Sequence, residues 1–338
     1  MSRLIVEINN TVVDTIESIS FSSTLDEIVS TVDANYNNTT INCGDSCNVF
    51  AESSNGNRVN VFCGFVFYTK SIVSSDEYSN QFIAYNLAKD IVDCSVLTKR
   101  FFAKKSFENI VKSIIDPFNI TLLNKSKISD TLDKFGISKT ETAFSAIERL
   151  CRYFSAMPRM DGLGQLVVDN FSNEPIHTFV LGQNISSLEV SVSHNDRFSE
   201  YYGKTDFIVS KGSTWKERLV TDKSVAVDTG LSRYRPCVLL PEGRLEKSKI
   251  ANRINWEAQT RAGKSISVSI VCSDFFIDNS LLEIGNTVNV ITSNKNYSLI
   301  INSLEFVQDS SNTSVYLNAV HAETYKQNPS EKINLVIR

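Results

Sequence analysis

Apolar and polar residues alternate with a period of two in many short runs along this chain. Within 265–272, Ile266, Val268, Ile270 and Cys272 alternate with Ser265, Ser267 and Ser269. Successive side chains of a strand point to opposite faces, so this alternation predicts one buried and one solvated face. Similar runs lie at 4–8, 16–21, 59–67, 178–181, 185–192, 201–209, 288–292, 297–306 and 314–320. An Asn-Gly pair supplies the positive φ angles of a tight turn and predicts a hairpin tip at 53–57.

The pattern between 96 and 175 changes to helical spacing. Ser106 can cap a short helix at its N-terminus. Ser138 and Glu141 form a capping-box pattern before a second helix, whose apolar face begins at Ala143. Strand-like runs lie at 120–123 and 165–169. Helices and strands mixed over so short a stretch predict a small α+β unit.

A third helix is predicted at 245–262, and its two sides differ. Ile250, Ile254, Ala258 and Ala262 line one side, which is the pattern of a helix face packed on a core. The other side carries Trp256, Arg253, Lys249 and Leu245. Tryptophan is enriched at the energetic centres of protein contacts, so these four residues are candidates for an interface with another subunit. Cover by another part of the same chain is an equally weighted alternative.

Strand-rich sequence on both sides of the α+β unit indicates three parts. We expect a first β domain at 1–95, the small α+β domain at 96–175, and a second β-rich region at 176–338 that contains the 245–262 helix. Short strands separated by turns in the first part are typical of a barrel or sandwich. A length of 338 residues exceeds what one core normally supports, which agrees with several domains. The fold class is therefore mainly β with an α+β insert.

Composition excludes several classes of protein. A net charge of -4 gives no general attraction to nucleic acid or to an anionic membrane. No apolar run approaches the ~18–20 residues that cross a bilayer, so we expect no stable membrane insertion. The N-terminus enters a strand-like run without the layout of a signal peptide, which favours production in a cytoplasm. The 7 cysteines, an odd number widely spaced, are then expected to be reduced.

Residues that could carry chemistry are scattered. Cys43 and Cys47 are a close pair, but nothing nearby completes a metal site. The histidines, which are His177, His194 and His321, lie in or beside strand-like runs without a nucleophile or ligand partner. No spacing singles out two acids across a cleft, although Asp90 and Asp93 are close together. A basic, aromatic cluster at 99–105 could contact phosphate, but a solvated connector is favoured. We predict no catalytic site, no metal and no cofactor.

Five segments of the chain carry a family resemblance through their order and spacing. They are Leu87–Ser95, Glu141–Cys151, Arg233–Cys272, Gly285–Val290 and Leu299–Asp309. In this order they resemble the baseplate hub proteins of Mu-like contractile phage tails, over nearly the whole chain. The resemblance implies two tube-like antiparallel β-barrel domains plus the small α+β domain, in a structural protein that is not an enzyme.

The same resemblance implies a set of partners. Such a hub is a homotrimer whose six lobes join a six-fold tail tube to a trimeric central spike. It lies in the virion tail baseplate, among other baseplate proteins, after assembly in the bacterial host cytoplasm, and DNA crosses its channel during genome ejection. A free phage, a prophage or tailocin, and the hub part of a type VI secretion-like spike complex all stay open. Alternatives from other classes are a tail-associated cell-wall hydrolase and a carbohydrate-binding β module.

Overall fold

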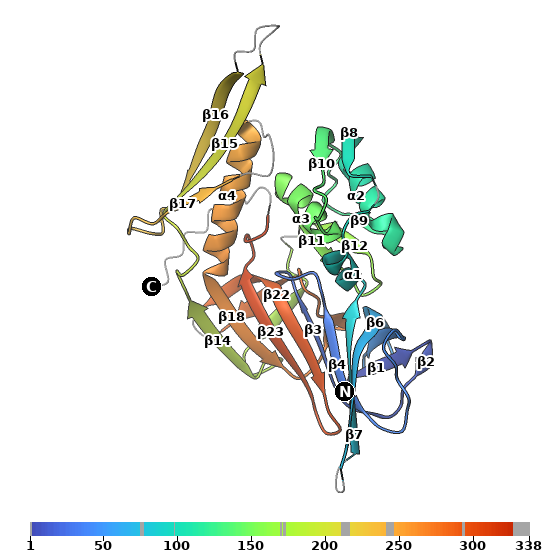
Figure 1. Cartoon of the computed structure of the whole chain (residues 1–338). Helices are drawn as coiled ribbons and strands as arrows, with labels where there is room; N and C mark the ends of the chain where they lie inside the picture. The colour runs from blue at the N-terminus through green and yellow to red at the C-terminus, as the bar shows by residue number, and fades with distance from the viewer. Residues whose placement is uncertain are drawn as a thin grey trace.

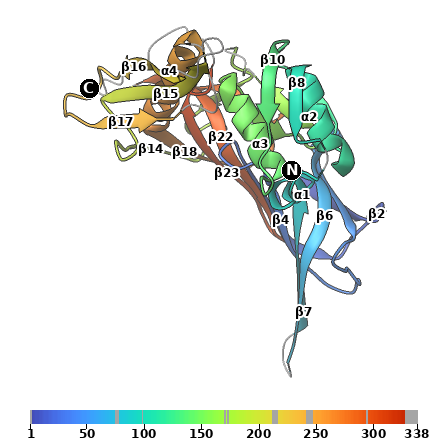
Figure 2. The ribbon, with the colours of Figure 1, turned by 45° about the horizontal axis from the view of Figure 1, so that its top comes forward.

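The computed structural model describes residues 2–74, 78–97, 99–169, 171, 174–210, 217–240, 247–292 and 295–326. Its fold is mainly β with a small α+β insert, as the sequence predicted. Figure 1 shows a large sheet at the base of the view, with the insert and a long helix standing above it. The β6–β7 hairpin extends away from the rest of the sheet in both ribbon views (Figures 1 and 2).

Thirteen strands form the large sheet. They are β1 (Arg3–Ile8), β2 (Thr11–Val12), β3 (Ile16–Thr24), β4 (Thr31–Tyr36), β5 (Ser46–Glu52), β6 (Arg58–Val73), β7 (Tyr78–Asn86), β13 (His177–Val180), β14 (Ser187–Val192), β18 (Ile266–Cys272), β21 (Thr287–Ile291), β22 (Asn296–Gln308) and β23 (Thr313–His321). The main path runs β14-β18-β23-β22-β3-β4-β7-β6-β5-β1-β2, and β21 and β13 branch from β22. Alternate residues point into one core, where the rings of Phe21 and Phe306 lie 5.8 Å apart.

Strand β22 joins the two β-rich parts of the chain. Its first half pairs with β21 and its second half pairs with β3, so two strands share one edge of it. A register shift between Ile301 and Ser303 marks the change, as a bulge does when it bends a strand. The two β-rich parts are therefore continuous with each other, and their division into two barrel domains stays an expectation. The parts at 1–95 and 176–338 share one sheet and one core, and neither closes into a barrel within the described residues.

The α+β insert has a core of its own. Its elements are α1 (Ala88–Asp93), β8 (Phe101–Ser106), α2 (Phe107–Ile115), the 3-10 turn η1 (Asp116–Phe118), β9 (Leu122–Asn124), β10 (Thr131–Gly136), α3 (Ala143–Tyr153), β11 (Met157–Met160) and β12 (Leu166–Asp169). The buried cluster begins at Ala88 and ends at Val168, with Ile28 added from the large sheet's side. Helix α1, which sequence analysis placed in the first β domain, thus packs with the insert.

The caps of the insert helices follow the sequence in one case and depart from it in the other. Ser106 caps α2 as predicted. Helix α3 begins at Ala143, and its N-cap is Thr142 rather than Ser138. The expected start was wrong because the Ser138–Glu141 hydrogen bond, 2.9 Å from backbone N to Oε2, closes a turn that precedes the helix. A Thr directly before the apolar run was the better signal.

A second sheet and α4 form the third unit. Its strands are β15 (Glu200–Ser210), β16 (Glu217–Val227) and β17 (Pro236–Leu239), in the order β16-β15-β17, and α4 spans Lys247–Lys264 alongside them (Figure 1). The short strands β19 (Phe276–Ile277) and β20 (Ser280–Leu281) form a separate hairpin. Ile250 and Ile254 pack against Tyr201, as their helical spacing predicted. Gly203 allows this contact, because a Cβ there would lie 2.7 Å from the Cγ2 of Ile250.

A buried ion pair closes the base of the third unit. Arg197 Nε lies 2.6 Å from Asp228 Oδ2, and Arg197 Nη2 donates to Asp228 Oδ1 at 2.8 Å. The third guanidinium nitrogen, Nη1, donates to Ser265 Oγ at 3.4 Å, just after α4. Two-point contact between a guanidinium and a carboxylate fixes both groups in one geometry. The pair therefore ties the ends of β15 and β16 to the end of the helix.

Candidate interaction surface

Seven neighbouring strands of the large sheet contain no lysine or arginine. They are β14, β18, β23, β22, β3, β4 and β7, which are consecutive along the main path of the sheet. The whole chain has 34 such residues, so basic side chains are common elsewhere. A broad, continuous stretch of sheet thus lacks the lysine and arginine side chains that neutralise phosphates.

The solvent-facing side of five of these strands forms one surface, which we call the polar face. It consists of Ser18, Ser20, Ser22, Thr31, Asp33, Asn35, Ser303, Glu305, Val307, Ser314, Tyr316, Asn318, Ser267, Ser269 and Val271. The strand register brings them together: Glu305 lies opposite Tyr316 on β23 and opposite Ser22 on β3, and Ser22 lies opposite Thr31 on β4. A hollow on this face is lined by hydroxyl, amide and apolar groups together with the carboxylates of Glu27 and Glu305. Because side chains of a strand alternate, the core residues between them point the other way.

Most hydrogen bonds between described residues of the polar face join neutral side chains. Asn318 Nδ2 donates to Ser267 Oγ at 2.8 Å, and Asn35 Nδ2 donates to Ser18 Oγ at 2.9 Å. Asp33 Oδ1 accepts from the amide of Gln81 on β7 at 2.8 Å. Its only charges among the described residues are the carboxylates of Asp33 and Glu305. Such a surface can form weak polar contacts and repels phosphate, and it offers no nucleophile paired with a base.

The structure places the predicted interface residues of the third helix in two groups. Trp256 is buried, and its indole Nε1 donates to the backbone oxygen of Tyr325 at 3.3 Å. Arg253 is also buried; its guanidinium lies 5.3 Å from the Trp256 ring and binds Glu257 at 2.8 Å. Trp256 is therefore covered by another part of its own chain, which is the second of the two alternatives. Leu245 and the side chain of Lys249 lie outside the described residues, so their part of the interface stays a prediction.

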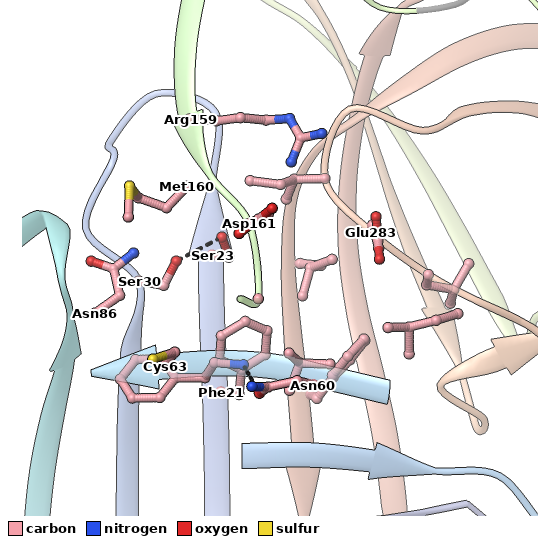
Figure 3. A pocket seen from close by; sticks show the side chains of 18 residues that line it. Phe21, Ser23, Ser30, Asn60, Cys63, Asn86, Arg159, Met160, Asp161 and Glu283 are labelled. Carbon is pink, nitrogen blue, oxygen red and sulfur yellow. Dashed lines mark hydrogen bonds between the residues drawn. The ribbon is translucent and has the colours of Figure 1, made fainter. Parts of the chain in front are cut away.

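A small cavity lies where the large sheet, the insert and the β19–β20 hairpin meet (Figure 3). Its volume is about 50 Å³, against the ~300–1,000 Å³ of typical ligand sites. Arg159 in its wall is held by Asp169 at 3.0 Å. Gly162 brings the insert against β6, because a Cβ there would lie 2.0 Å from the backbone oxygen of Asn60. The cavity thus marks a tight junction between parts of the chain, and it has room for a few waters.

The thiols of the chain are free cysteines in the structure. Burial raises the pKa of Cys47 to about 12, so its thiol stays protonated and Cys43 and Cys47 are not a ready metal pair. Among the described residues, no three acidic, histidine or cysteine side chains gather as metal ligands. None of the described helices is long and apolar enough to cross a bilayer.

The basic cluster at 99–105 is part of the insert rather than a connector between domains. Residues 101–106 form β8, which pairs with β10. The Lys99 ammonium lies 5.6 Å from the ring of Phe102, and Lys104 and Lys105 are exposed. The adjacent phenylalanines Phe101 and Phe102 favour a strand, which the charge of the cluster does not reveal.

Comparison with known proteins connects this architecture to phage tails. Residues 88–170 match the family model of the second domain of gp44-like baseplate hub proteins. The baseplate hub protein gp44 of Escherichia phage Mu is 23% identical over 215 residues, which cover 61% of this chain and 56% of the Mu protein. The alignment thus spans little more than half of that relative's length.

Two solved structures share the fold over nearly the whole chain. The 43 kDa tail protein of prophage MuSo2 from Shewanella oneidensis has a TM-score of 0.81 at 20% identity, covering 96% of this chain and 99% of that one. A tail protein from Neisseria meningitidis has a TM-score of 0.80 at 16% identity, covering 96% and 98%. The domain match and the shared fold confirm the resemblance found in the sequence: this chain is similar to the baseplate hub proteins of Mu-like phage tails, with a gp44-like second domain at 88–170.

Proposed function

We propose that this protein is a structural subunit of a baseplate hub, a homotrimer that joins a six-fold tail tube to a trimeric central spike. The observation that carries the proposal is the gp44-like second domain at 88–170, inserted into a fold shared with Mu-like tail proteins over 96% of the chain. Its place is the tail baseplate of a virion or prophage particle, assembled in the host cytoplasm among other baseplate proteins.

The topology of the large sheet supports the match between threefold and sixfold symmetry. Four strands, β14, β18, β23 and β22, lie on one side of the β22–β3 junction, and β3, β4, β7 and β6 lie on the other. Each subunit would therefore present two similar four-stranded halves to a ring. Three subunits present six halves, which equals the number of subunits in each ring of a six-fold tube.

The polar face is the proposed lining of the central channel. A duplex that crosses a channel during ejection must not be held by its phosphates, and each neutralised phosphate adds to affinity by releasing counterions. Five neighbouring strands present serine, threonine and asparagine there, with Asp33 and Glu305 as carboxylates. The face would therefore let DNA slide past. A tail-associated hydrolase would instead need two acids that face each other across an open cleft.

Light scattering on the purified protein, alone and after co-expression with the spike protein, tests the proposal. A complex with three copies of the 37.8 kDa chain, formed either alone or with the spike, is the expected result. A protein that stays monomeric and unbound in both samples contradicts the hub. Clearing of purified peptidoglycan by the protein would favour the hydrolase in its place.

A further inference from the structure

Strands β8 and β10 form a two-stranded sheet on the side of the insert away from the large sheet (Figure 1). Phe102 and Phe135 lie opposite each other and are buried, so one side of this small sheet packs on the insert core. Side chains alternate along a strand, so the other side carries the cross-strand pairs Phe101 with Gly136, Ala103 with Lys134, and Lys105 with Leu132. Leu132, beside the start of α2, is buried. We call the exposed residues of this side the lysine face: Phe101, Ala103, Lys105, Lys134 and Gly136.

The lysine face combines two cations with an exposed aromatic ring. Phe101 is 56% exposed, which leaves much of its apolar surface in water. The face contains no acidic residue, and among the described residues neither Lys105 nor Lys134 has an ion-pair partner. By contrast, Lys112 on α2 pairs with Glu108 one helical turn away, at 3.7 Å. The two lysines therefore leave their charges available to another molecule.

The backbone of this small sheet favours contact through its face over contact through its edges. Lys104 has a φ of 48°, which interrupts the extended backbone in the middle of β8. Irregular backbone and lysine side chains along an edge disfavour the addition of another strand. At the end of β10, the backbone oxygen of Gly136 accepts a hydrogen bond from Arg149 Nη2 at 2.7 Å, so this group is already used. Gly136 also has open space where a Cβ would lie, which leaves room beside the Phe101 ring for an apolar side chain.

We propose that the lysine face binds an acidic, extended segment of a partner protein. Carboxylates of the segment meet Lys105 and Lys134, and one of its apolar side chains covers Phe101. The insert has more basic than acidic residues although the whole chain has a net charge of -4, so the insert attracts an anionic partner that the rest of the chain does not.

Charge and shape favour a protein over nucleic acid as the occupant. Nucleic acid is held by a stripe of cations that follows its phosphates, whereas the lysine face has two lysines around one aromatic ring. An acidic protein segment uses both features, because it brings carboxylates and apolar side chains together. That this partner is a neighbouring baseplate protein rests on the proposed function, whereas the surface itself does not.

Fluorescence anisotropy tests the lysine face, with the full chain titrated into a short labelled peptide of alternating glutamate and valine. Lys105→Glu with Lys134→Glu should weaken binding roughly tenfold or more, because two attractions become repulsions, and added salt should weaken binding to the parent. Lys125→Glu with Lys127→Glu is the matched control. It makes the same change of charge at exposed lysines between β9 and β10, and it should alter the affinity by less than about twofold. Phe101→Ser should weaken binding of the alternating peptide but not of poly-glutamate, which has no apolar side chain.

The outcomes decide the partner class and leave the hub as a separate question. A loss of affinity in Lys105→Glu with Lys134→Glu, together with the selective effect of Phe101→Ser, supports the proposal. Absence of peptide binding to the parent, an equal loss in the control, or an unchanged affinity in Phe101→Ser overturns it. Tighter binding of duplex DNA or of vesicles that contain anionic lipid, lost in the same lysine variant, also overturns it by assigning the face to another class of partner. The number of copies seen by light scattering does not depend on these lysines, so failure here leaves the threefold hub standing.

Discussion

Breaking the Arg197–Asp228 ion pair should destabilise the third unit far more than breaking an exposed ion pair of the same length would destabilise its own region. Its side chains are 1% and 7% exposed, and the shortest distance between them is 2.6 Å. The pair between Arg3 and Glu52 has the same 2.6 Å distance, but its side chains are 65% and 22% exposed. Burial is thus the main difference between the two pairs. We use Arg197→Met as the perturbation and Arg3→Met as its control.

Burial decides the magnitude, because the carboxylate that is left behind cannot be hydrated. Loss of one partner of a buried pair costs about 3–5 kcal/mol, whereas exposed pairs contribute ~0–1 kcal/mol. At 1.36 kcal/mol per factor of ten, Arg197→Met should raise the equilibrium constant for local opening of this unit by roughly 10²·²- to 10³·⁷-fold. Arg3→Met should raise the same constant for its own strand, β1, by less than about tenfold. Replacing both partners, as Arg197→Met with Asp228→Leu, should restore most of the loss, since no unpaired charge remains.

Hydrogen exchange of the full chain, followed by mass spectrometry, measures these effects locally. The amides of β17 and of the first residues of β15 should lose protection in Arg197→Met, while those of the insert should not change. Exchange in β17 that is as slow in Arg197→Met as in Arg3→Met would refute the reasoning, because burial would then add nothing to the pair. The same conclusion follows if the double variant is no more stable than the single one.

Three further substitutions test other parts of the structure. Trp256→Ala should lower the free energy of unfolding by about 3–5 kcal/mol in urea melts; because Trp256 is covered by its own chain, the folded variant should keep the mass of the parent assembly in light scattering. Gly162→Ala should loosen the insert from β6 and speed proteolysis there, whereas Gly136→Ala should not, because a Cβ at Gly136 has open space around it. Equal resistance of the two variants to protease would contradict the close approach of Gly162 to Asn60. Burial lowers the pKa of His177, so as the pH falls the unfolded chain binds the proton before the folded chain does, and the free energy of unfolding should decrease below pH ~6.5. In melts at successive pH values, His177→Gln should reduce this loss of stability. An unchanged pH dependence in the variant would assign the loss to other titratable groups.

Local pattern was enough to predict most of the elements. The alternation at 265–272 became β18, and the spacing of Ile250 and Ile254 became the buried side of α4, because period and burial are linked through backbone geometry. The start of α3 was missed by a few residues, since Ser138 and Thr142 both fit the chemistry of a cap. Which of them caps depends on where the chain turns before the helix.

The sequence pattern does not predict which strands are neighbours in the candidate surface. Each strand of the polar face is visibly free of lysine and arginine in the sequence, yet only the topology makes these strands neighbours. The cover of Trp256 comes from Tyr325, a residue 69 positions away. A helical period shows that Trp256 lies off the core stripe, and it carries no information on what packs there.

Most elements, the α+β insert and the shortage of basic residues in the strands could be predicted from the sequence, because they depend on local propensity and composition. The pairing of β22 with both β21 and β3, which makes the two β-rich parts one continuous sheet, is visible only in the folded chain. Tertiary structure also decided that β14 and the far end of β6 are left with open edges among the described residues. The physical reason is that a strand's period specifies which face is buried, while its hydrogen-bond partners are chosen by long-range packing.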